Sequence, residues 1–418
     1  MDSKSIIDDK YIMYYKRTLY NRWLEISEQF PVLLLTGPRQ IGKTTFLKHI
    51  SEQGRTYVTL DDPDKRLLAK EDPATFFRRY QPPILIDEIQ YAPGLLSYIK
   101  MEVDSNHKAG QFWLTGSQQF QMMRGITETL AGRVAIINML GFSGNERHRE
   151  NIEELPFLPM RELLENRLTK IKNVESKNIY DEIWQGSFPA LVTSKVKDWE
   201  VFYSSYLRTY LERDVRDLAQ VGDEGAFLTF LRACAARTAQ ILNLTELARD
   251  ADISVKTAKN WLSILQASFQ VFLLQPYHSN LTKRLVKRPK LYFLDTGLCS
   301  YLTEWTTSKA LSVGAMSGAI LETYALAEIL KSWWHQCKMP SIYYYRDKDG
   351  VEMDFLITQN QKFYPLEVKK SASPKKKWIS AFSTVSRLGQ IDGGGVLCLC
   401  KELLPMGKNI YAIPINII

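Results

Sequence analysis

The sequence GPRQIGKTT runs from Gly37 to Thr45 and has the spacing of a phosphate-binding loop: a glycine, four residues, then Gly-Lys-Thr. The apolar run 32–35 comes directly before it and predicts a buried strand. The two glycines allow the backbone amides to turn toward an oxyanion, and a helix that begins near Lys43 adds its positive end. The stretch therefore predicts a strand, a phosphate loop and a helix of an α/β nucleotide domain.

The residue types in this loop predict a site for ATP and Mg²⁺. Lys43 is expected to bind the β and γ phosphates, and the hydroxyl of Thr44 is expected to ligate the Mg²⁺ that bridges them. The alternative is a glycine-rich turn with a chance lysine. The residues expected to surround the nucleotide are Gly37, Pro38, Arg39, Gln40, Ile41, Gly42, Lys43, Thr44 and Thr45.

A second acidic segment supports the nucleotide site. In PPILIDEIQYAP the run 84–86 predicts a buried parallel strand, and Asp87 and Glu88 follow at its end. Asp87 is expected to hold Mg²⁺ through water. Glu88 is placed to orient and polarise the attacking water, so this pair predicts hydrolysis as well as binding.

Two further stretches complete a family resemblance. QFWLTGSQQF predicts a strand that ends at Thr115 and Ser117, and TETLAGRVAIINML places Arg133 before another strand. With GPRQIGKTT and LIDEIQ, these stretches resemble the AAA+ ATPases, and more closely a prokaryotic subgroup with LTGSQ and SLAGR, the latter here TLAGR. The resemblance implies that Ser117, in preference to Thr115, is the sensor 1 residue. It leaves Arg133 and Arg124 as candidates for an arginine finger, each equally well explained as a surface or salt-bridged arginine.

The chain is expected to form four parts: an ATPase core over 1–145, a helical lid over 146–222, a winged helix-turn-helix over 223–300 and a nuclease-like domain over 301–418. The lid segment carries an aromatic stripe at helical spacing, which predicts core packing in preference to a base-stacking platform. The stripe consists of Trp199, Phe202, Tyr203, Tyr206 and Tyr210.

The helix-turn-helix prediction rests on two caps. Thr245 is placed to cap a short helix and Ser254 a second helix through about 266, with a hairpin after it. Basic residues on the second helix and in the hairpin predict contacts with DNA phosphates. A protein-interaction module is the alternative. The residues expected to contact DNA are Lys256, Lys259, Asn260, Lys283, Arg284, Lys287 and Arg288, with Lys290 in the same basic wing.

The C-terminal part predicts a second acidic site. A hairpin formed by two strands of period two gathers Asp354, Glu367 and Lys369, and Glu322 lies on a helix upstream. Two carboxylates fit Mg²⁺ or Mn²⁺, and a lysine beside them can stabilise developing phosphate charge. This arrangement resembles the PD-(D/E)xK, restriction-endonuclease-like fold. The alternatives are a solvated charged face and a relative of that fold that has lost catalysis.

Composition limits the class of protein. The chain has 418 residues, of which 45% are hydrophobic and 24% charged, as is typical of a soluble globular protein. Its net charge of +8 indicates a mild preference for polyanions. Its five cysteines form no CxxC pair, which indicates core thiols in place of a disulfide framework. No signal peptide and no run of about twenty apolar residues is present, so we expect a cytoplasmic protein without membrane partners.

These observations predict an AAA+ ATPase that binds and hydrolyses ATP with Mg²⁺ and binds, remodels or processes DNA. A second divalent ion at the C-terminal site and an oligomeric assembly are compatible with this function. The alternative is an ATP-switched regulator of the STAND type. In that case the winged helix binds a protein partner and the nuclease-like domain is inactive.

Overall fold

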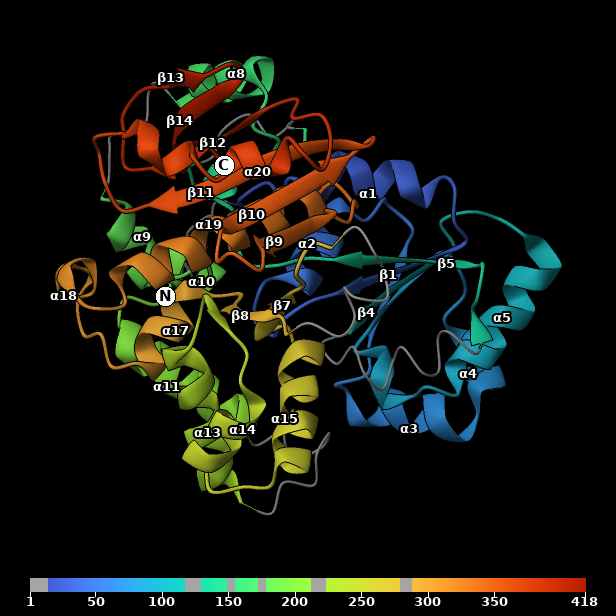
Figure 1. The fold of residues 1–418 in the computed structure, drawn as a ribbon. Helices are drawn as coiled ribbons and strands as arrows, with labels where there is room; N and C mark the ends of the chain where they lie inside the picture. The colour runs from blue at the N-terminus through green and yellow to red at the C-terminus, as the bar shows by residue number, and fades with distance from the viewer. Residues whose placement is uncertain (1–13, 117–128, 149–154, 172–177, 212–222, 279–287) are drawn as a thin grey trace, which may run out of the picture.

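The structure is a computed structural model that describes residues 14–116, 129–148, 155–171, 178–211, 223–278 and 288–418. It contains a five-stranded sheet, a six-stranded sheet and a three-stranded sheet among these residues. In Figure 1 the five-stranded sheet lies to the right, the six-stranded sheet at the top, and helices α13 to α15 at the bottom. The predicted α/β class is confirmed.

The first sheet is parallel throughout and has the order β2-β3-β4-β1-β5. Every residue of β1, β3 and β4 is buried, as expected for strands covered on both faces. This order places β1, and the loop that follows it, between β4 and the edge strand β5. The strands are β1 (Val32–Thr36), β2 (Thr56–Thr59), β3 (Ile84–Asp87), β4 (Phe112–Gly116) and β5 (Val134–Asn138).

Helices cover both faces of this sheet. Leu33 and Leu35 belong to the large core that includes α1 (Leu19–Ser27) and α2 (Lys43–Ile50). The alternate residues of β1 belong to a separate core. Because side chains alternate along a strand, one continuous apolar run supplies both cores. The helices of the second face are α3 (Pro63–Glu71), α4 (Pro73–Arg79) and α5 (Leu95–Asn106).

A group of helices follows the sheet: α7 (Gly144–His148), α8 (Arg161–Ile171), α9 (Ile179–Gln185), α10 (Pro189–Val192) and α11 (Trp199–Tyr210). The aromatic stripe lies on α11, and most of it is buried against Phe188. Trp199, at its edge, stacks on Trp184 with ring centroids 4.3 Å apart. The prediction that these rings pack in the core is confirmed.

The next unit has three helices and a small antiparallel sheet of order β6-β8-β7. Ser254 caps α15 as predicted, because its side chain accepts from the backbone N–H of Thr257. The predicted cap of the preceding helix is wrong: Asn243 caps α14, and Thr245 lies inside it. The elements are α13 (Glu224–Ala236), β6 (Gln240–Ile241), α14 (Leu244–Asp250), α15 (Val255–Ala267), β7 (Val271–Leu274) and β8 (Lys290–Phe293).

The C-terminal unit is built on a mixed sheet of order β13-β14-β12-β11-β10-β9. The predicted hairpin of β10 and β11 is present and pairs Phe355 with Leu366. Helix α19 is buried along most of its length and contacts both β11 and β8. The elements are α17 (Thr296–Leu302), α18 (Ser308–Val313), α19 (Ser317–Trp334), β9 (Ile342–Arg346), β10 (Glu352–Gln359), β11 (Lys362–Lys369), α20 (Phe382–Val385), β12 (Gly394–Cys398), β13 (Leu404–Gly407) and β14 (Ile410–Pro414).

These units share one hydrophobic core. The largest cluster of buried side chains contains residues from α1, α11, α15, α19 and β11. The segment after β7 also joins the C-terminal sheet, since Pro276 forms a parallel bridge with Tyr344. In the part of the chain that the structure describes, no helix is both long enough and apolar enough to cross a membrane.

The observed cap of α14 leads to a stability prediction. Asn243→Ala should lower the free energy of unfolding by about 1 kcal/mol, because the N–H of Glu246 loses its acceptor. Thr245→Ala is the matched control and should cost nothing, since alanine has the higher helix propensity and Thr245 is exposed. Thermal unfolding followed by circular dichroism measures both variants. A loss that is larger at Thr245 than at Asn243 would contradict the assignment of the cap.

Candidate nucleotide-binding site

The loop 37–45 connects the carboxyl end of β1 to α2, as its sequence predicts. Gly42 stands at the start of α2 with a φ of 87°, in the left-handed region that favours glycine. Gly37 has a φ of 149°, and a Cβ there would lie 2.0 Å from the carbonyl oxygen of Met139. Gly37 is therefore required both by its backbone conformation and by the space around it.

Lys43 is folded into the loop. Its side chain is buried, and its Nζ donates hydrogen bonds to the carbonyl oxygens of Gly37 and Pro38 at 2.9 and 2.7 Å. Carbonyl oxygens of the loop thus hold the ammonium group, and the backbone amides of such a loop can bind phosphate. Binding of the ATP phosphates by Lys43 stays a prediction from the sequence.

Three hydroxyl groups from three elements meet at Asp87. Thr44 Oγ1 lies 2.9 Å from Asp87 Oδ1, and Tyr57 donates to Asp87 Oδ2 at 3.2 Å. The hydroxyl of Thr115 donates to Asp87 Oδ1. Burial, followed by the Asp87 carboxylate, raises the pKa of Tyr57 to about 12, so this phenol remains a donor. A carboxylate beside the Thr44 hydroxyl is a suitable oxygen donor set for Mg²⁺.

Glu88 adopts an unusual backbone conformation beside this carboxylate. Its φ is 58°, a left-handed value that costs a residue with a side chain about 1 kcal/mol or more. Its backbone N–H donates to Thr115 Oγ1 at 3.2 Å, and its side chain accepts from Gln90 Nε2. The strain turns the Glu88 side chain away from the direction it would take in a continued strand. Such strain is concentrated at functional sites.

The structure adds Tyr57 and Gln90 to the predicted residues. Nothing local in the sequence marks Tyr57, because its contact with Asp87 depends on the parallel pairing of β2 with β3. Gln90 lies in the LIDEIQ segment, two residues after Glu88, and could have been considered. Thr115 is the sensor candidate in contact with Asp87, whereas Ser117 lies outside the described residues.

Comparison with known families agrees with this geometry. Residues 29–148 match the family model described as an AAA domain. The chain carries a P-loop domain of the AAA type. Two more models match the rest of the chain, at 176–309 and 317–418, and both are described as domains of unknown function, DUF8612 and DUF4143. The AAA match spans the loop, β3 and Thr115.

Curated relatives have been found in two mycobacteria. They are the uncharacterized proteins Mb2031c of Mycobacterium bovis and Rv2008c of Mycobacterium tuberculosis. Each is 28% identical over 396 residues, and each alignment covers 92% of this chain and 80% of the relative. The similarity therefore extends over nearly all of the chain and is not confined to the AAA domain.

Solved structures were compared as well. The RuvB Holliday junction branch migration motor of Thermotoga maritima aligns with 61% of this chain and 86% of its own, at 15% identity and a TM-score of 0.29. A DNA replication initiation factor aligns with 60% of this chain and 90% of its own, at 12% identity and a TM-score of 0.27. Scores this low do not establish a common overall arrangement.

Arg133 lies far from the phosphate loop of its own AAA domain. It precedes β5, and its carbonyl oxygen accepts from the N–H of Val32 at the start of β1, whereas the loop follows the end of β1. The five residues of β1 therefore separate Arg133 from the phosphate loop by roughly 16 Å. Its guanidinium contacts both carboxylate oxygens of Asp104, at 2.5 and 3.1 Å. Arg124, the other finger candidate, lies outside the described residues.

A turn in the middle of the predicted lid lies against the phosphate loop. A Cβ on Gly42 would be 4.0 Å from Pro189 Cγ, and the carbonyl of Ser187 accepts from the N–H of Phe142 at 2.8 Å. The side chain of Asp295 accepts from both the N–H and the hydroxyl of Ser187, and from Tyr203. Asp295 was not predicted from the sequence, and it links the predicted lid to the start of α17.

The structure brings the predicted C-terminal residues together. Lys369 Nζ lies 3.5 Å from Asp354 Oδ2 and also contacts Glu367. Burial and then the charge of Asp354 raise the pKa of Glu322 to about 7 and that of Glu367 to about 8. Within the described ranges no group of three or more carboxylate, histidine or cysteine side chains is arranged to hold a metal ion. The predicted second divalent ion therefore has no support from this geometry.

The predicted DNA contacts divide into two groups. Lys256, Lys259 and Asn260 are exposed on α15, whose opposite face is buried, and Arg288 is exposed as well. Three others lie outside the described residues: Lys283, Arg284 and Lys287. The assignment of Lys290 to an exposed wing is wrong, because it is only 4% exposed and its ammonium group is bound by carboxylates.

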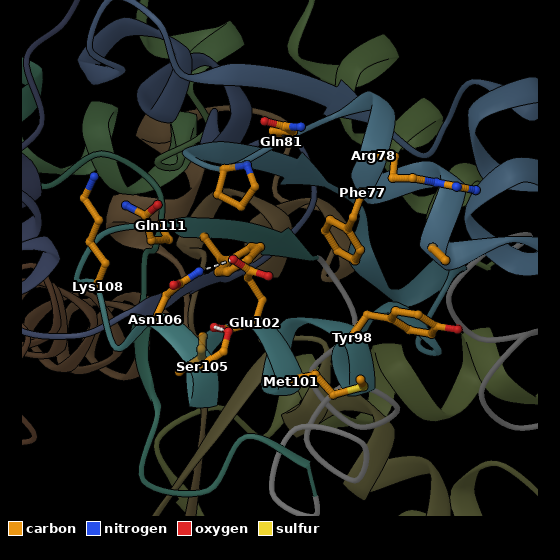
Figure 2. Close-up of a pocket in the computed structure, with 14 residues that line it drawn as sticks. Phe77, Arg78, Gln81, Tyr98, Met101, Glu102, Ser105, Asn106, Lys108 and Gln111 are labelled. Atoms are coloured by element: carbon orange, nitrogen blue, oxygen red, sulfur yellow. Dashed lines mark hydrogen bonds between the residues drawn. The ribbon is translucent and has the colours of Figure 1, made fainter.

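A wide groove lies at the other edge of the AAA domain. It has a volume of about 900 Å³ and is lined by α4, α5 and the starts of β3 and β4, with Phe77, Tyr98 and Met101 among its residues (Figure 2). These are the amino ends of the strands, whereas the phosphate loop follows a carboxyl end. The groove is therefore distinct from the nucleotide site.

The surroundings of Gly37 give a sharp test of the loop. Gly37→Ala should abolish nucleotide binding, because a Cβ would collide with the carbonyl of Met139. Gly54→Ala is the matched control: Gly54 also has a positive φ, of 107°, but nothing lies within 4 Å of its Cβ position. Titration with a fluorescent ATP analogue, after circular dichroism has confirmed folding, measures both. Unchanged affinity in a folded Gly37→Ala protein would contradict the assignment of the loop.

Proposed function

We propose that this protein is a Mg²⁺-dependent ATPase that acts on DNA. ATPase activity is inferred mainly from one observation: Thr44 contacts Asp87, and the buried Lys43 is the residue before Thr44. It joins a phosphate-binding cation to a hydroxyl and carboxylate pair suited to Mg²⁺. The match of residues 29–148 to the AAA domain supports the same function.

Each side chain then has a separate role. Lys43 and the amides of loop 37–45 bind the phosphates, and Thr44 with Asp87 would hold Mg²⁺, which neutralises charge on the phosphates when bound. Glu88 accepts a proton from the attacking water or orients it. Thr115 donates to Asp87 and accepts from the N–H of Glu88, so it keeps the two carboxylates in register. Gln90 holds the Glu88 side chain.

Two further proposals concern the arginine finger and the division of the chain into domains. Arg133 lies roughly 16 Å from its own loop, so it can act only on the nucleotide of a second copy. We therefore propose an oligomer in which Arg133 gives up its ion pair with Asp104 and contacts the nucleotide of a neighbouring copy. We retain four domains over 1–145, 146–222, 223–300 and 301–418; the family matches over 29–148 and 317–418 fall largely in the first and the last of them, and the match over 176–309 spans both middle parts.

Binding to DNA is proposed for the exposed face of α15. Lys256, Lys259 and Asn260 lie on the side of the helix opposite to the buried Trp261, and Arg288 is exposed near β8. Lysine and arginine side chains on an outward helix face contact phosphates, and an asparagine can read a base edge. The net charge of +8 favours the same partner.

A second candidate function is an ATP-dependent switch with a protein partner and an inactive nuclease-like domain. The observation that favours it is the ion pairing of the C-terminal carboxylates with lysines of the chain itself. The two functions differ in one measurement. Duplex or branched DNA should raise ATP turnover several-fold in low salt if the protein acts on DNA, and should leave it unchanged if the protein is a switch.

Two substitutions test the ATPase. Lys43→Ala should weaken ATP binding, because the phosphates lose their cation. Glu88→Gln should keep ATP bound and lower turnover by about 100-fold or more, since hydrolysis alone needs the carboxylate. Glu71→Gln, on an exposed glutamate, is the control. Phosphate release and equilibrium binding measure the two steps, and normal turnover in Glu88→Gln would refute the catalytic assignment.

The role of α15 is tested through salt dependence. The double variant Lys256→Ala/Lys259→Ala should weaken DNA binding and reduce the slope of log affinity against log salt by about 2, one phosphate contact for each lysine. Lys401→Ala/Lys408→Ala removes the same charge from exposed positions elsewhere and should leave the slope unchanged. Fluorescence anisotropy over a salt series measures the slope. Equal slopes for the two variants would exclude α15 as the DNA contact.

A further inference from the structure

Four carboxylates gather where β8, α19 and the β10–β11 hairpin meet. We define the carboxylate cluster as Glu322 of α19, Glu352 and Asp354 of β10, and Glu367 of β11. Charge from one member acts on another, because Asp354 raises the pKa of both Glu322 and Glu367. One ammonium group, that of Lys290, contacts Glu322 and Glu352, and another, that of Lys369, contacts Asp354 and Glu367, so the members lie close together.

A lysine of another sheet supplies part of that compensation. Lys290 begins β8, and its side chain is 5% exposed. Its Nζ lies 2.8 Å from Glu352 Oε1 and 3.4 Å from Glu322 Oε1. Burial lowers the pKa of Lys290, but Glu322, Asp354 and Glu352 outweigh it, so the pKa is raised and the side chain is charged.

Residues of β8 and β11 also donate to the carboxylate cluster. The hydroxyl of Tyr292, two residues after Lys290 and therefore on the same face of β8, donates to Glu322 Oε1 at 2.5 Å. Asp354 Oδ2 accepts from the N–H of Val368 at 2.8 Å and contacts Lys369. Glu367 is paired with Lys369. Each of the three predicted metal ligands is thus bound by donors of the chain.

We propose that Lys290 is the built-in counter-cation of the carboxylate cluster and that its ammonium group keeps a divalent cation out. A divalent ion takes six or more oxygen ligands. Here Glu322 Oε1 already accepts from Lys290 and Tyr292, and Glu367 Oε2 accepts from Lys369. A second positive charge within a few ångströms would also repel the ion. The proposal concerns the C-terminal unit and does not depend on ATP hydrolysis.

The strand that carries Lys290 is attached to the C-terminal sheet. The N–H of Tyr344 on β9 donates to the carbonyl of Gln275 at 3.1 Å, and its hydroxyl donates to the carbonyl of Arg288 at 2.5 Å. Lys290 itself lies over the ring of Tyr344, 5.6 Å from the centroid. For the carboxylates to lose their contact with Lys290, either the Lys290 side chain must turn away or the three-stranded sheet must move. Because α15 packs on β7 of this sheet, the cluster is linked to the proposed DNA contact.

Binding of Mn²⁺ to nucleotide-free protein tests the proposal. Asp87→Asn serves as the background, so that the nucleotide site does not contribute. We expect no saturable Mn²⁺ binding at the cluster in this background, measured as free Mn²⁺ by electron paramagnetic resonance. Adding Lys290→Met should create one saturable site, because the nearby positive charge is gone, and this site should bind Mn²⁺ at least about tenfold more tightly than the non-specific binding of the background protein. A further Asp354→Asn change should remove that site.

Lys362→Met is the matched control, since Lys362 lies on β11 of the same sheet and pairs with Asp392 away from the cluster. Lys290→Gln is a second variant that retains a donor to Glu352 and should show the same gain if the methionine variant does not fold. Two results would overturn the proposal. One is Mn²⁺ binding in the Asp87→Asn background that Asp354→Asn abolishes, and the other is no gain of binding in a folded Lys290 variant.

Discussion

The buried carboxylate of Asp87 must be compensated, and the way the chain compensates it organises the AAA domain. An ionised carboxylate taken out of water is costly unless hydrogen bonds replace its hydration. Asp87 accepts them from Thr44, Tyr57 and Thr115, which lie on α2, β2 and β4. One side chain thus joins three elements at the carboxyl edge of the sheet, where the phosphate loop and Glu88 also lie.

Buried charge also joins the AAA domain to the C-terminal unit. Glu146, at the end of the AAA match, is paired with Arg17 at 3.1 Å and faces His335, just after α19, at 3.4 Å. Burial raises the pKa of Glu146, but its interactions with the Arg17 guanidinium and with His335 outweigh burial, so its pKa is lowered. Glu328 and Lys331 of α19 bind the backbone at Gly144 and Phe142. Buried pairs of this kind give little net stability but allow few alternative arrangements.

The two predicted sites differ in how their residues are compensated. In the AAA domain, neutral hydroxyls bind Asp87, and these can share a carboxylate with a metal ion. In the C-terminal unit, ammonium groups bind the carboxylates, and an ammonium group competes with a metal ion for the same oxygens. The Glu-x-Lys spacing in the sequence is the same in either case, so the motif alone does not distinguish an active site from an ion-paired one.

Local patterns predicted most of the residues that meet in the candidate nucleotide site. Lys43, Thr44, Asp87 and Glu88 are marked by spacing within short segments, because a phosphate loop and a buried strand end are properties of a few consecutive residues. Tyr57 could not be predicted in this way, since its contact arises from the pairing of β2 with β3. The cap at Asn243 was missed because both Asn243 and Thr245 have side chains able to cap a helix.

The sequence by itself determined the α/β class, the phosphate loop, the aromatic core of α11 and the hairpin that gathers Asp354, Glu367 and Lys369. Each depends on periodicity or spacing along the chain. Only the tertiary structure decided the position of Lys290, which composition places in a basic, exposed wing. Its ammonium group is buried because β8 packs against α19 and the C-terminal sheet. That packing brings Lys290 together with Glu322 and Glu352, which lie 32 and 62 positions further along the chain. No pattern along the chain records such a contact, because it depends on how separate sheets meet in space.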